Sequence, residues 1–243
     1  MNAPSNLFAG VRHSRSMTVS LAMKFAAQWM AAVAGLGLAF PGVAARAADF
    51  ELSQAEIQRI EKDEIVIRAL LDASARRGTV RAAMLVDAPP AVVFSAMTGC
   101  AAALKYVPHL RLCRVRERAP DSSWVLVEQE IDFGWYAPRL RYVFRADLVA
   151  DRSISFRQVS GDFKANEGRW ELEPVEGERT LLRYRVYIDP PGYVPNWLAR
   201  STFKRELPQM LTDLRRFCEA EQAARAQARA APHLPNQQSP SID

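Results

Sequence analysis

The sequence contains very little histidine, and this scarcity excludes several common kinds of catalytic site. Its 3 His are His13 near the start, His233 near the end, and His109 between a predicted helix and a predicted strand. A catalytic nucleophile paired with histidine would have to use His109. The His and Cys residues are also not spaced as the ligands of a metal site are. No glycine-rich phosphate loop follows a predicted strand. We therefore expect no recognisable catalytic residues, no metal and no cofactor.

Acidic residues are absent from the first 47 residues, which hold 4 of the 32 Lys+Arg. A basic start, an Ala/Gly-rich apolar run over residues 25–40 and the small residues Ala45-Arg46-Ala47 follow one another. This order is typical of a secretory signal peptide with an A-x-A cleavage site. We expect residues 1–47 to be removed before Ala48, with Met17 or Met23 as alternative start codons, and the mature protein to be periplasmic or secreted.

Long apolar runs and a strong excess of charge are also missing. The run at 25–40 is shorter than the roughly 20 residues of a spanning helix, although an uncleaved anchor is the alternative interpretation. Without the leader, 28 Lys+Arg stand against 27 Asp+Glu, a net charge of +1. Nucleic-acid binding needs a concentrated basic surface, so we expect no nucleic-acid partner.

The sequence does contain many segments in which apolar and polar residues alternate, and these predict a mostly antiparallel sheet. A capping box at Ser53-Gln54-Ala55-Glu56 predicts a short helix to about Glu61. Two more short helices are expected at 91–98 and 101–106. The predicted strands are 64–71, 79–86, 110–116, 124–131, 139–148, 153–159, 165–173 and 181–188.

A helical period follows from Pro195 to Gln222, with a bend expected at Pro208 because a proline inside a helix removes a backbone hydrogen bond. Residues 223–243 have no apolar periodicity and are expected to form a disordered tail. The predicted organisation is a signal peptide (1–47), an N-terminal helix and strand extension (48–78), one folded domain (79–222) and the tail.

Four segments resemble the START-like superfamily, also called SRPBCC or polyketide cyclase/dehydrase, and within it the branch of coenzyme Q-binding proteins. The resemblance extends over about residues 79–219. It implies an α+β helix-grip fold, in which a curved antiparallel sheet wraps around a long C-terminal helix and two short helices follow the first long strand. The segments are Val86 to Phe94, Tyr106 to Leu110, Gly161 to Lys164 with Gly168 to Trp170, and Val194 to Leu198 with Leu207 to Leu211.

A helix-grip fold encloses a cavity, and the alternation supplies apolar walls for it. The same residues could instead fill an ordinary core. Tyr142 and Tyr184 are the best candidates for ligand specificity, because a buried phenol needs a hydrogen-bond partner. The candidate ligand-binding residues are Tyr142, Phe144, Phe156, Trp170, Tyr184, Trp197, Leu207, Met210 and Leu211.

Charged residues and cysteines give three further expectations. Glu128 and Glu130 share one face of a strand, and we interpret them as ordinary exposed charges. The basic residues Arg200, Lys204 and Arg205 form a solvated helix face or contact a membrane surface transiently. Among Cys100, Cys113 and Cys218, a disulfide between the first two would leave the third free, and three reduced thiols are the alternative.

Three functions are consistent with these observations. The first is an exported carrier or chaperone for a quinone, lipid or isoprenoid. The second is a cyclase or aromatase that uses the same cavity for a polyketide-like substrate. The third is an interaction module without a ligand.

Overall fold

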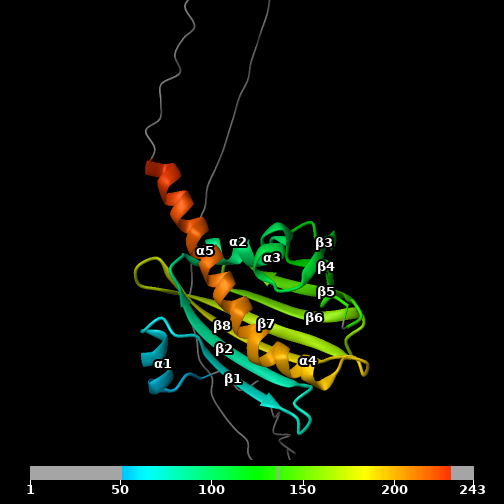
Figure 1. Ribbon diagram of the computed structural model, residues 1–243. Helices are drawn as coiled ribbons and strands as arrows, with labels where there is room; N and C mark the ends of the chain where they lie inside the picture. The colour runs from blue at the N-terminus through cyan, green and yellow to red at the C-terminus, as the bar shows by residue number, and fades with distance from the viewer. Residues whose placement is uncertain (1–50, 136, 231–243) are drawn as a thin grey trace, which may run out of the picture. The chain divides into compact units, whose positions relative to one another are not determined.

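One antiparallel sheet organises the computed structural model, which describes residues 51–135 and 137–230 (Figure 1). Among these residues eight strands lie in the order β1-β2-β8-β7-β6-β5-β4-β3, and the last strand, β8, pairs with β2. The predicted antiparallel sheet is therefore confirmed. The strands are β1 (Val66–Leu71), β2 (Gly78–Val86), β3 (Leu110–Arg118), β4 (Trp124–Ile131), β5 (Leu140–Val149), β6 (Ser153–Gly161), β7 (Ala165–Val175) and β8 (Arg179–Asp189).

The alternation along each strand separates an apolar face of the sheet from a charged one. In β8 the side chains of Leu182, Tyr184 and Val186 are buried in the main core, whereas Arg183 and Arg185 lie on the other face. Successive side chains of a strand point to opposite faces, which is why a period of two in the sequence becomes two faces of the sheet. The apolar face receives the helices that follow β2.

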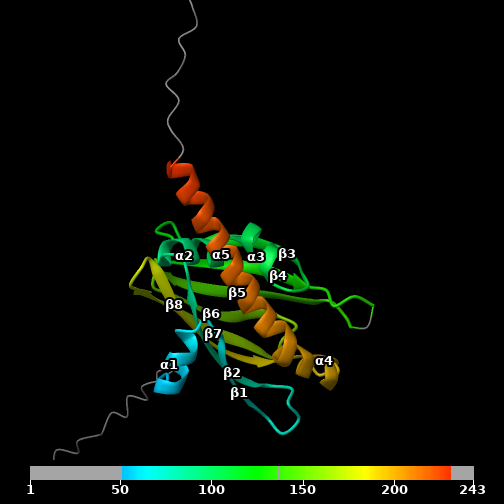
Figure 2. The ribbon, with the colours of Figure 1, turned by 60° about the vertical axis from the view of Figure 1, so that its left-hand side comes forward.

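The helices α2 (Pro90–Thr98) and α3 (Cys100–Tyr106) follow β2, as the sequence predicted. A long helical segment near the C-terminus crosses the apolar face of the sheet diagonally, and both views show it there (Figures 1 and 2). It packs against α2, α3 and β2. The expected helix-grip arrangement, a curved sheet around a long C-terminal helix, is confirmed.

The C-terminal helical segment departs from the single bent helix expected over 195–222. It consists of α4 (Asn196–Ser201), the π-helical turn η1 (Thr202–Glu206) and α5 (Leu207–Ala230). The irregular turn lies where the bend was expected, because Pro208 has no N–H to continue the regular ladder and its ring crowds the preceding turn. A widened turn resolves both problems, and it carries Phe203 into the core.

The end of α5 corrects the predicted boundary of the tail. Residues 223–230 continue the helix to Ala230 and extend beyond the sheet, although they were expected to be disordered (Figure 1). This part of the sequence is rich in Ala, Gln and Arg, which have high helix propensity even where no apolar face is buried. The remaining tail and the predicted signal peptide lie outside the described residues.

A small N-terminal element covers the charged face of the sheet near β1. The helix α1 (Gln54–Ile60) begins at the expected capping box, with Ser53 as its N-cap and Glu56 at its third position. Its Ile60 packs with Val66 of β1 and with Ala83 and Leu85 of β2. No helix in the described part of the chain has the length and hydropathy needed to cross a membrane.

Candidate binding cavity

A cavity of about 270 Å³ lies between the apolar face of the sheet and the segment from α4 to α5. It is partly open to solvent, and its walls are mainly aromatic and aliphatic side chains. The sheet contributes residues from β4 to β8, and the helices contribute from α2, α3 and the C-terminal segment. Seven of the nine candidate ligand-binding residues line it, namely Tyr142, Phe144, Phe156, Trp170, Tyr184, Leu207 and Met210.

The other two candidates, Trp197 and Leu211, do not line this cavity. Trp197 is 57% exposed on α4, whose inner side carries the buried Leu198 and Ala199. Leu211 is 1% exposed and belongs to the main core behind the cavity wall. Successive helical residues are about 100° apart around the axis, so the inner face could be assigned only once the helix was placed on the sheet.

Several lining residues were not among the candidates, because they lie outside the alternating strands or in loops. Phe133 and Val194 pack together in a second apolar cluster at the α4 end of the cavity, with Phe163 against it. Tyr106, the last residue of α3, also faces the cavity. Loop aromatics have no periodicity that would reveal them, although Tyr106 and Phe163 fall within the segments that carry the family resemblance.

Aromatic pairs build the floor of the cavity. Trp170 of β7 and Tyr184 of β8 are directly opposite each other in the sheet, and their rings stack with centroids 3.6 Å apart. The ring of Phe156 lies over Gly168, where an added Cβ would come within 2.7 Å of the ring Cζ and 2.4 Å of the Arg185 carbonyl oxygen. Gly168 is therefore required for this ring position, which shapes the wall between β6 and β8.

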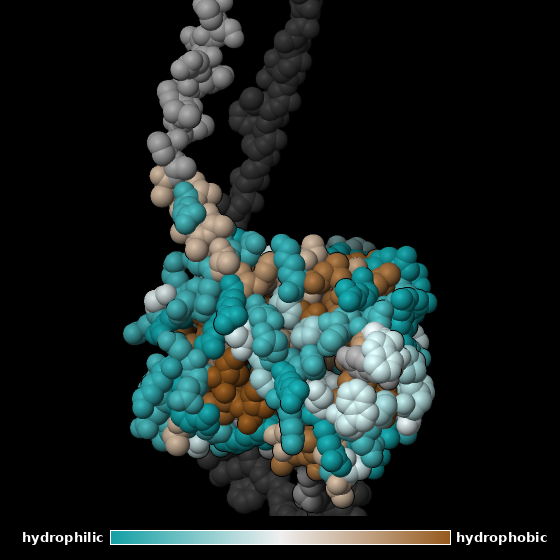
Figure 3. All heavy atoms as spheres, viewed as in Figure 1, coloured by the Kyte–Doolittle hydropathy of each residue, from teal (hydrophilic) through white to brown (hydrophobic). Residues whose placement is uncertain are grey.

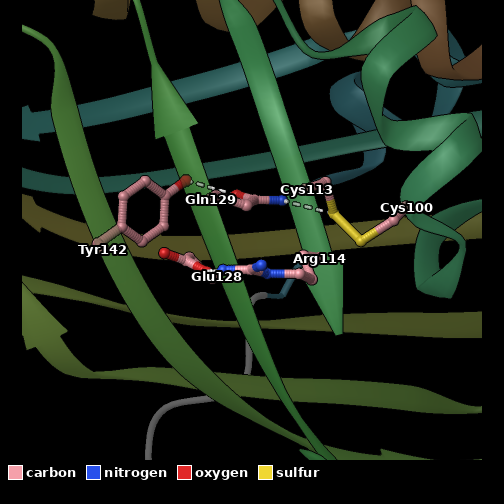
Figure 4. Close-up of a disulfide and its surroundings, with 6 residues drawn as sticks. All are labelled: Cys100, Cys113, Arg114, Glu128, Gln129 and Tyr142. Atoms are coloured by element: carbon pink, nitrogen blue, oxygen red, sulfur yellow. Dashed lines mark hydrogen bonds and ion pairs between the residues drawn. A yellow bond between two sulfur atoms is a disulfide. The ribbon is translucent and has the colours of Figure 1, made fainter. Parts of the chain in front are cut away.

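Few polar groups reach the cavity, and some of them already have a hydrogen-bond partner within the protein. The Tyr142 hydroxyl donates a hydrogen bond to Gln129 Oε1 at 2.6 Å, and Gln129 Nε2 lies 3.8 Å from Cys113 Sγ (Figure 4). Burial raises the pKa of Tyr106, Tyr142 and Tyr184 well above the usual value for a phenol. All three therefore remain protonated and neutral at physiological pH.

The α4 end of the cavity carries its acidic and basic side chains. His109 Nε2 lies 3.3 Å from Glu206 Oε2 of the π-helical turn, and the His109 ring packs 5.0 Å from that of Phe133. Arg76, in the turn between β1 and β2, donates to Asn196 Oδ1 and to the Pro191 carbonyl, each at 3.0 Å. These bonds connect the β1–β2 turn to the segment around α4. No nucleophile lies beside His109 among the lining residues, and the described residues contain no cluster suited to a metal ion.

A disulfide joins Cys100, at the start of α3, to Cys113 in β3 (Figure 4). The bond closes a short segment that includes α3 and the turn into β3, and Tyr106 and His109 of that segment line the cavity. The remaining cysteine, Cys218, is buried on α5, and burial raises the pKa of its thiol to about 12. Cys218 is therefore an inert core residue.

Glu128 and Glu130 correct the expectation of exposed strand charges. Their residues are only 8% and 7% exposed, because arginine side chains lie over them. Arg114 Nη2 is 2.6 Å from Glu128 Oε2, with Arg116 also in contact, and Glu130 pairs with Arg139 and Arg141. These ion pairs lie on the face of the sheet opposite the cavity, so they brace the strands and do not contact a ligand.

Comparisons with known proteins agree with this architecture. The sequence profile of the family described as polyketide cyclase / dehydrase and lipid transport matches residues 86–215. Among curated proteins no significant match was found. Solved structures share the fold at low sequence identity, and three with TM-scores above 0.5 illustrate this.

The first of these three structures is a STAR-related lipid transfer protein from Xanthomonas axonopodis. It is 15% identical with a TM-score of 0.53, and the match covers 63% of this chain and 93% of that one. A human lipid transfer and protein localization domain is 15% identical with a TM-score of 0.51, covering 69% and 98%. The Zhui aromatase/cyclase from Streptomyces is 16% identical with a TM-score of 0.51, covering 69% and 100%.

These structural likenesses show a common fold, and the family is shown by the sequence profile. The profile extends from the last residue of β2 into α5, so it includes most of the strands and helices that enclose the cavity. It also covers more than half of the 243 residues. This chain belongs to the polyketide cyclase / dehydrase and lipid transport family.

Proposed function

We propose that this protein is an exported binding protein that encloses a hydrophobic small molecule, a quinone, lipid or isoprenoid, and serves as its carrier or chaperone. The observation that carries the proposal is the aromatic cavity between the sheet and the C-terminal helices. Transfer of apolar surface from water into such a cavity is favourable by about 25 cal/mol per Å². The family's description includes lipid transport. A ligand of the coenzyme Q type fits this chemistry, since it combines a long apolar chain with a ring that carries oxygen atoms.

The alternative is that the same cavity guides a cyclase or aromatase reaction. The family description also names cyclases and dehydrases, and a shaped pocket with a few polar groups can direct a reactive polyketide-like substrate. A ligand-free interaction module is the third possibility, which would be favoured by a cavity that never takes up a guest. Binding is the better-supported function because the cavity walls are mainly aromatic and aliphatic, which is what a hydrophobic guest requires.

Export is proposed from the sequence of the first 47 residues. A basic start, a short apolar run and the Ala45-Arg46-Ala47 site are the features of a cleaved leader. N-terminal sequencing of the protein recovered from its native cell fraction should give Ala48 as the first residue. An unprocessed product held in the membrane would contradict the proposal.

Contact with a membrane surface is proposed as the way in which the ligand enters and leaves. Exposed aromatic side chains gather at the α4 end of the cavity: Trp135 is 97% exposed, and Tyr193 and Trp197 are more than half exposed. In Figure 3, side chains of intermediate hydropathy, the range of tryptophan and tyrosine, collect on the surface beside α4. Tryptophan and tyrosine favour the membrane interface. Lys204 and Arg205 are exposed next to them and would attract anionic lipids.

The membrane contact can be tested by sedimentation with phosphatidylcholine vesicles, with and without phosphatidylglycerol. We expect binding that increases with the anionic lipid, and that decreases severalfold in a Lys204→Glu, Arg205→Glu variant. The matched control is Arg225→Glu, Arg229→Glu, the same charge change at the exposed far end of α5. Equal binding by both variants would contradict a membrane contact at the α4 end.

The cavity itself is tested by its contents and by ligand-dependent stability. Mass spectrometry of organic extracts from the mature protein should detect a hydrophobic molecule. Added ubiquinone in detergent micelles should raise the melting temperature, since a ligand at about 100 times its Kd adds roughly 2.7 kcal/mol of stability. A protein that yields no extracted molecule, and that neither a quinone nor a lipid stabilises, would overturn the binding proposal.

Two matched threonines provide the control variants for this experiment. Thr202 lines the cavity and Thr212 does not, yet each donates its hydroxyl to the carbonyl four residues earlier in the helix, at 3.1 and 3.0 Å. Thr202→Phe should fill the cavity and remove the ligand-induced rise in melting temperature. Thr212→Phe should retain it. If both variants respond to the ligand as the wild type does, the ligand binds elsewhere.

A further inference from the structure

Two tyrosine hydroxyls at the cavity wall have no hydrogen-bond partner among the described residues. Tyr184 and Tyr106 both line the cavity, and each residue is 8% exposed. Tyr142 differs from them, because its hydroxyl is already bonded to Gln129 Oε1. A hydroxyl that faces a cavity and has no protein partner is usually matched by water or by a ligand.

The two free hydroxyls act as neutral donors in one region of the cavity. Burial is the main cause of the raised pKa of Tyr184, and the nearby Tyr142 and Tyr106 hydroxyls raise it further. All three phenols line the same cavity. Because they stay protonated, Tyr106 and Tyr184 each offer an O–H to an acceptor atom in the cavity.

Among the described lining residues, no arginine or lysine lies beside Tyr184 to receive an anionic group. The acidic and basic side chains that line the cavity are Arg76, His109 and Glu206, of which the last two lie 3.3 Å apart. Arg76 lies beyond the start of β2 at Gly78, whereas Tyr184 pairs with Ala82, four residues further along that strand. Four residues of extended strand span roughly 13 Å. A carboxylate beside Tyr184 would therefore lose its hydration without gaining a counter-ion.

We infer that the cavity selects uncharged hydrophobic molecules that carry a carbonyl or quinone oxygen, and that Tyr184 and Tyr106 donate hydrogen bonds to this oxygen. The inference rests on the proposed binding function and specifies its ligand class. The Trp170 ring stacks on the Tyr184 ring at 3.6 Å and holds that phenol in place. The Tyr184 hydroxyl can then bond to the ligand. Tyr142 supports the wall through Gln129 and does not recognise the ligand.

Three probes of similar size separate the effects of hydrophobic contact, hydrogen bonding and charge on affinity. 2-Acetylnaphthalene carries a ketone, 2-ethylnaphthalene has no acceptor, and 2-naphthoate is an anion. Their affinities for the mature protein are measured by equilibrium dialysis at neutral pH. Tyr184→Phe should lower the affinity for the ketone relative to the hydrocarbon by about fivefold to tenfold, the value of one neutral hydrogen bond. Adding Tyr106→Phe should lower that ratio further, and the naphthoate should bind most weakly of the three to the wild type.

A conservative variant serves as the control, with melting temperatures measured for every protein. Tyr187→Phe alters the same strand on the opposite face. It should keep the ketone-to-hydrocarbon ratio of the wild type. If Tyr184→Phe does not fold, the Tyr106→Phe variant alone gives the same comparison.

The outcomes distinguish this inference from the proposed function. If the hydrocarbon binds but the double variant keeps the wild-type ratio, or the naphthoate binds as tightly as the ketone, the inference is wrong and hydrophobic binding stands. If none of the probes binds, although the protein is folded, both the inference and the binding function for molecules of this size are wrong.

Discussion

Individual side chains of the same chemical type have different roles in this protein, and their neighbours decide which. Glu128 and Glu130 lie under arginines, and their carboxylates are almost completely covered. A hydrogen bond from Arg114 is the largest cause that lowers the pKa of Glu128, and the charges of Arg114, Arg116 and Arg141 add to it. A carboxylate in this setting stabilises the fold only while it is ionised.

Glu128 should therefore make stability depend on pH in the acidic range. Its folded-state pKa lies below the ordinary value of 4.5, so its contribution is present above that value and is lost as the pH falls through the folded-state pKa. Glu128→Gln should be less stable than the wild type near neutral pH and should lose less stability on acidification. Urea unfolding at several values between about pH 7 and about pH 3 measures both effects.

The control for this prediction is Glu171→Gln. Glu171 also pairs with an arginine, Arg169 at 2.8 Å, but both side chains of that pair are at least 40% exposed. Exposed pairs contribute little, so this variant should follow the wild-type curve closely. Parallel pH curves for Glu128→Gln and the wild type would show that the buried pair has no special role.

At the scale of secondary-structure elements, the disulfide fixes α3 to β3. Without it, the segment that carries Tyr106 and His109 would be held by noncovalent contacts alone. The bond closes a loop with a sequence separation of 13, for which the loss of unfolded-state entropy is worth about 3 kcal/mol. Cys113→Ser should lower the free energy of unfolding by about that amount, as measured by urea denaturation under non-reducing conditions.

Thiol counting checks the pairing directly. The denatured, unreduced mature protein should have one reactive thiol, that of Cys218, and three after reduction. Three thiols before reduction would show that the cysteines are not paired in the protein as isolated.

Close contact between neighbouring strands makes Gly168 another sensitive position. A methyl group there would overlap the Arg185 carbonyl oxygen on β8 and the Phe156 ring on β6. Gly168→Ala should force both to move, with a cost of about 1–3 kcal/mol in stability, as for other overpacked cores. Thermal unfolding checks this value, and Gly192→Ala is a suitable control because nothing lies within 4 Å of the position of its Cβ. Similar melting temperatures for the two variants would contradict the close contact.

At the scale of the whole molecule, residues 51–230 belong to one compact unit. A chain that begins at Ala48 should therefore fold without residues 1–47. It should unfold in a single cooperative transition, detected at the same temperature by circular dichroism and by tryptophan fluorescence. Two separate transitions, or a chain that fails to fold, would show that the first 47 residues are part of the structure.

The sequence by itself determined the elements and their faces. Apolar and charged residues alternate in β8, and because the side-chain period of a strand is two, this pattern specifies one buried face. The apolar residues are Leu182, Tyr184 and Val186, and the charged ones are Arg183 and Arg185. The capping box and the prolines marked where the helices begin and where the long helix becomes irregular. These are local effects of backbone geometry, so they are visible in a single sequence.

Only the tertiary structure decided which residues meet in the cavity. Trp197 and Leu211 share the apolar character of Met210, yet one is exposed and the other is core, because the position of α4 and α5 on the sheet sets which side faces inward. Phe133 and Phe163 come from loops, whose placement depends on contacts distant in sequence. The difference between Tyr142 and Tyr184 has the same origin, since Gln129 of the neighbouring strand satisfies only the first.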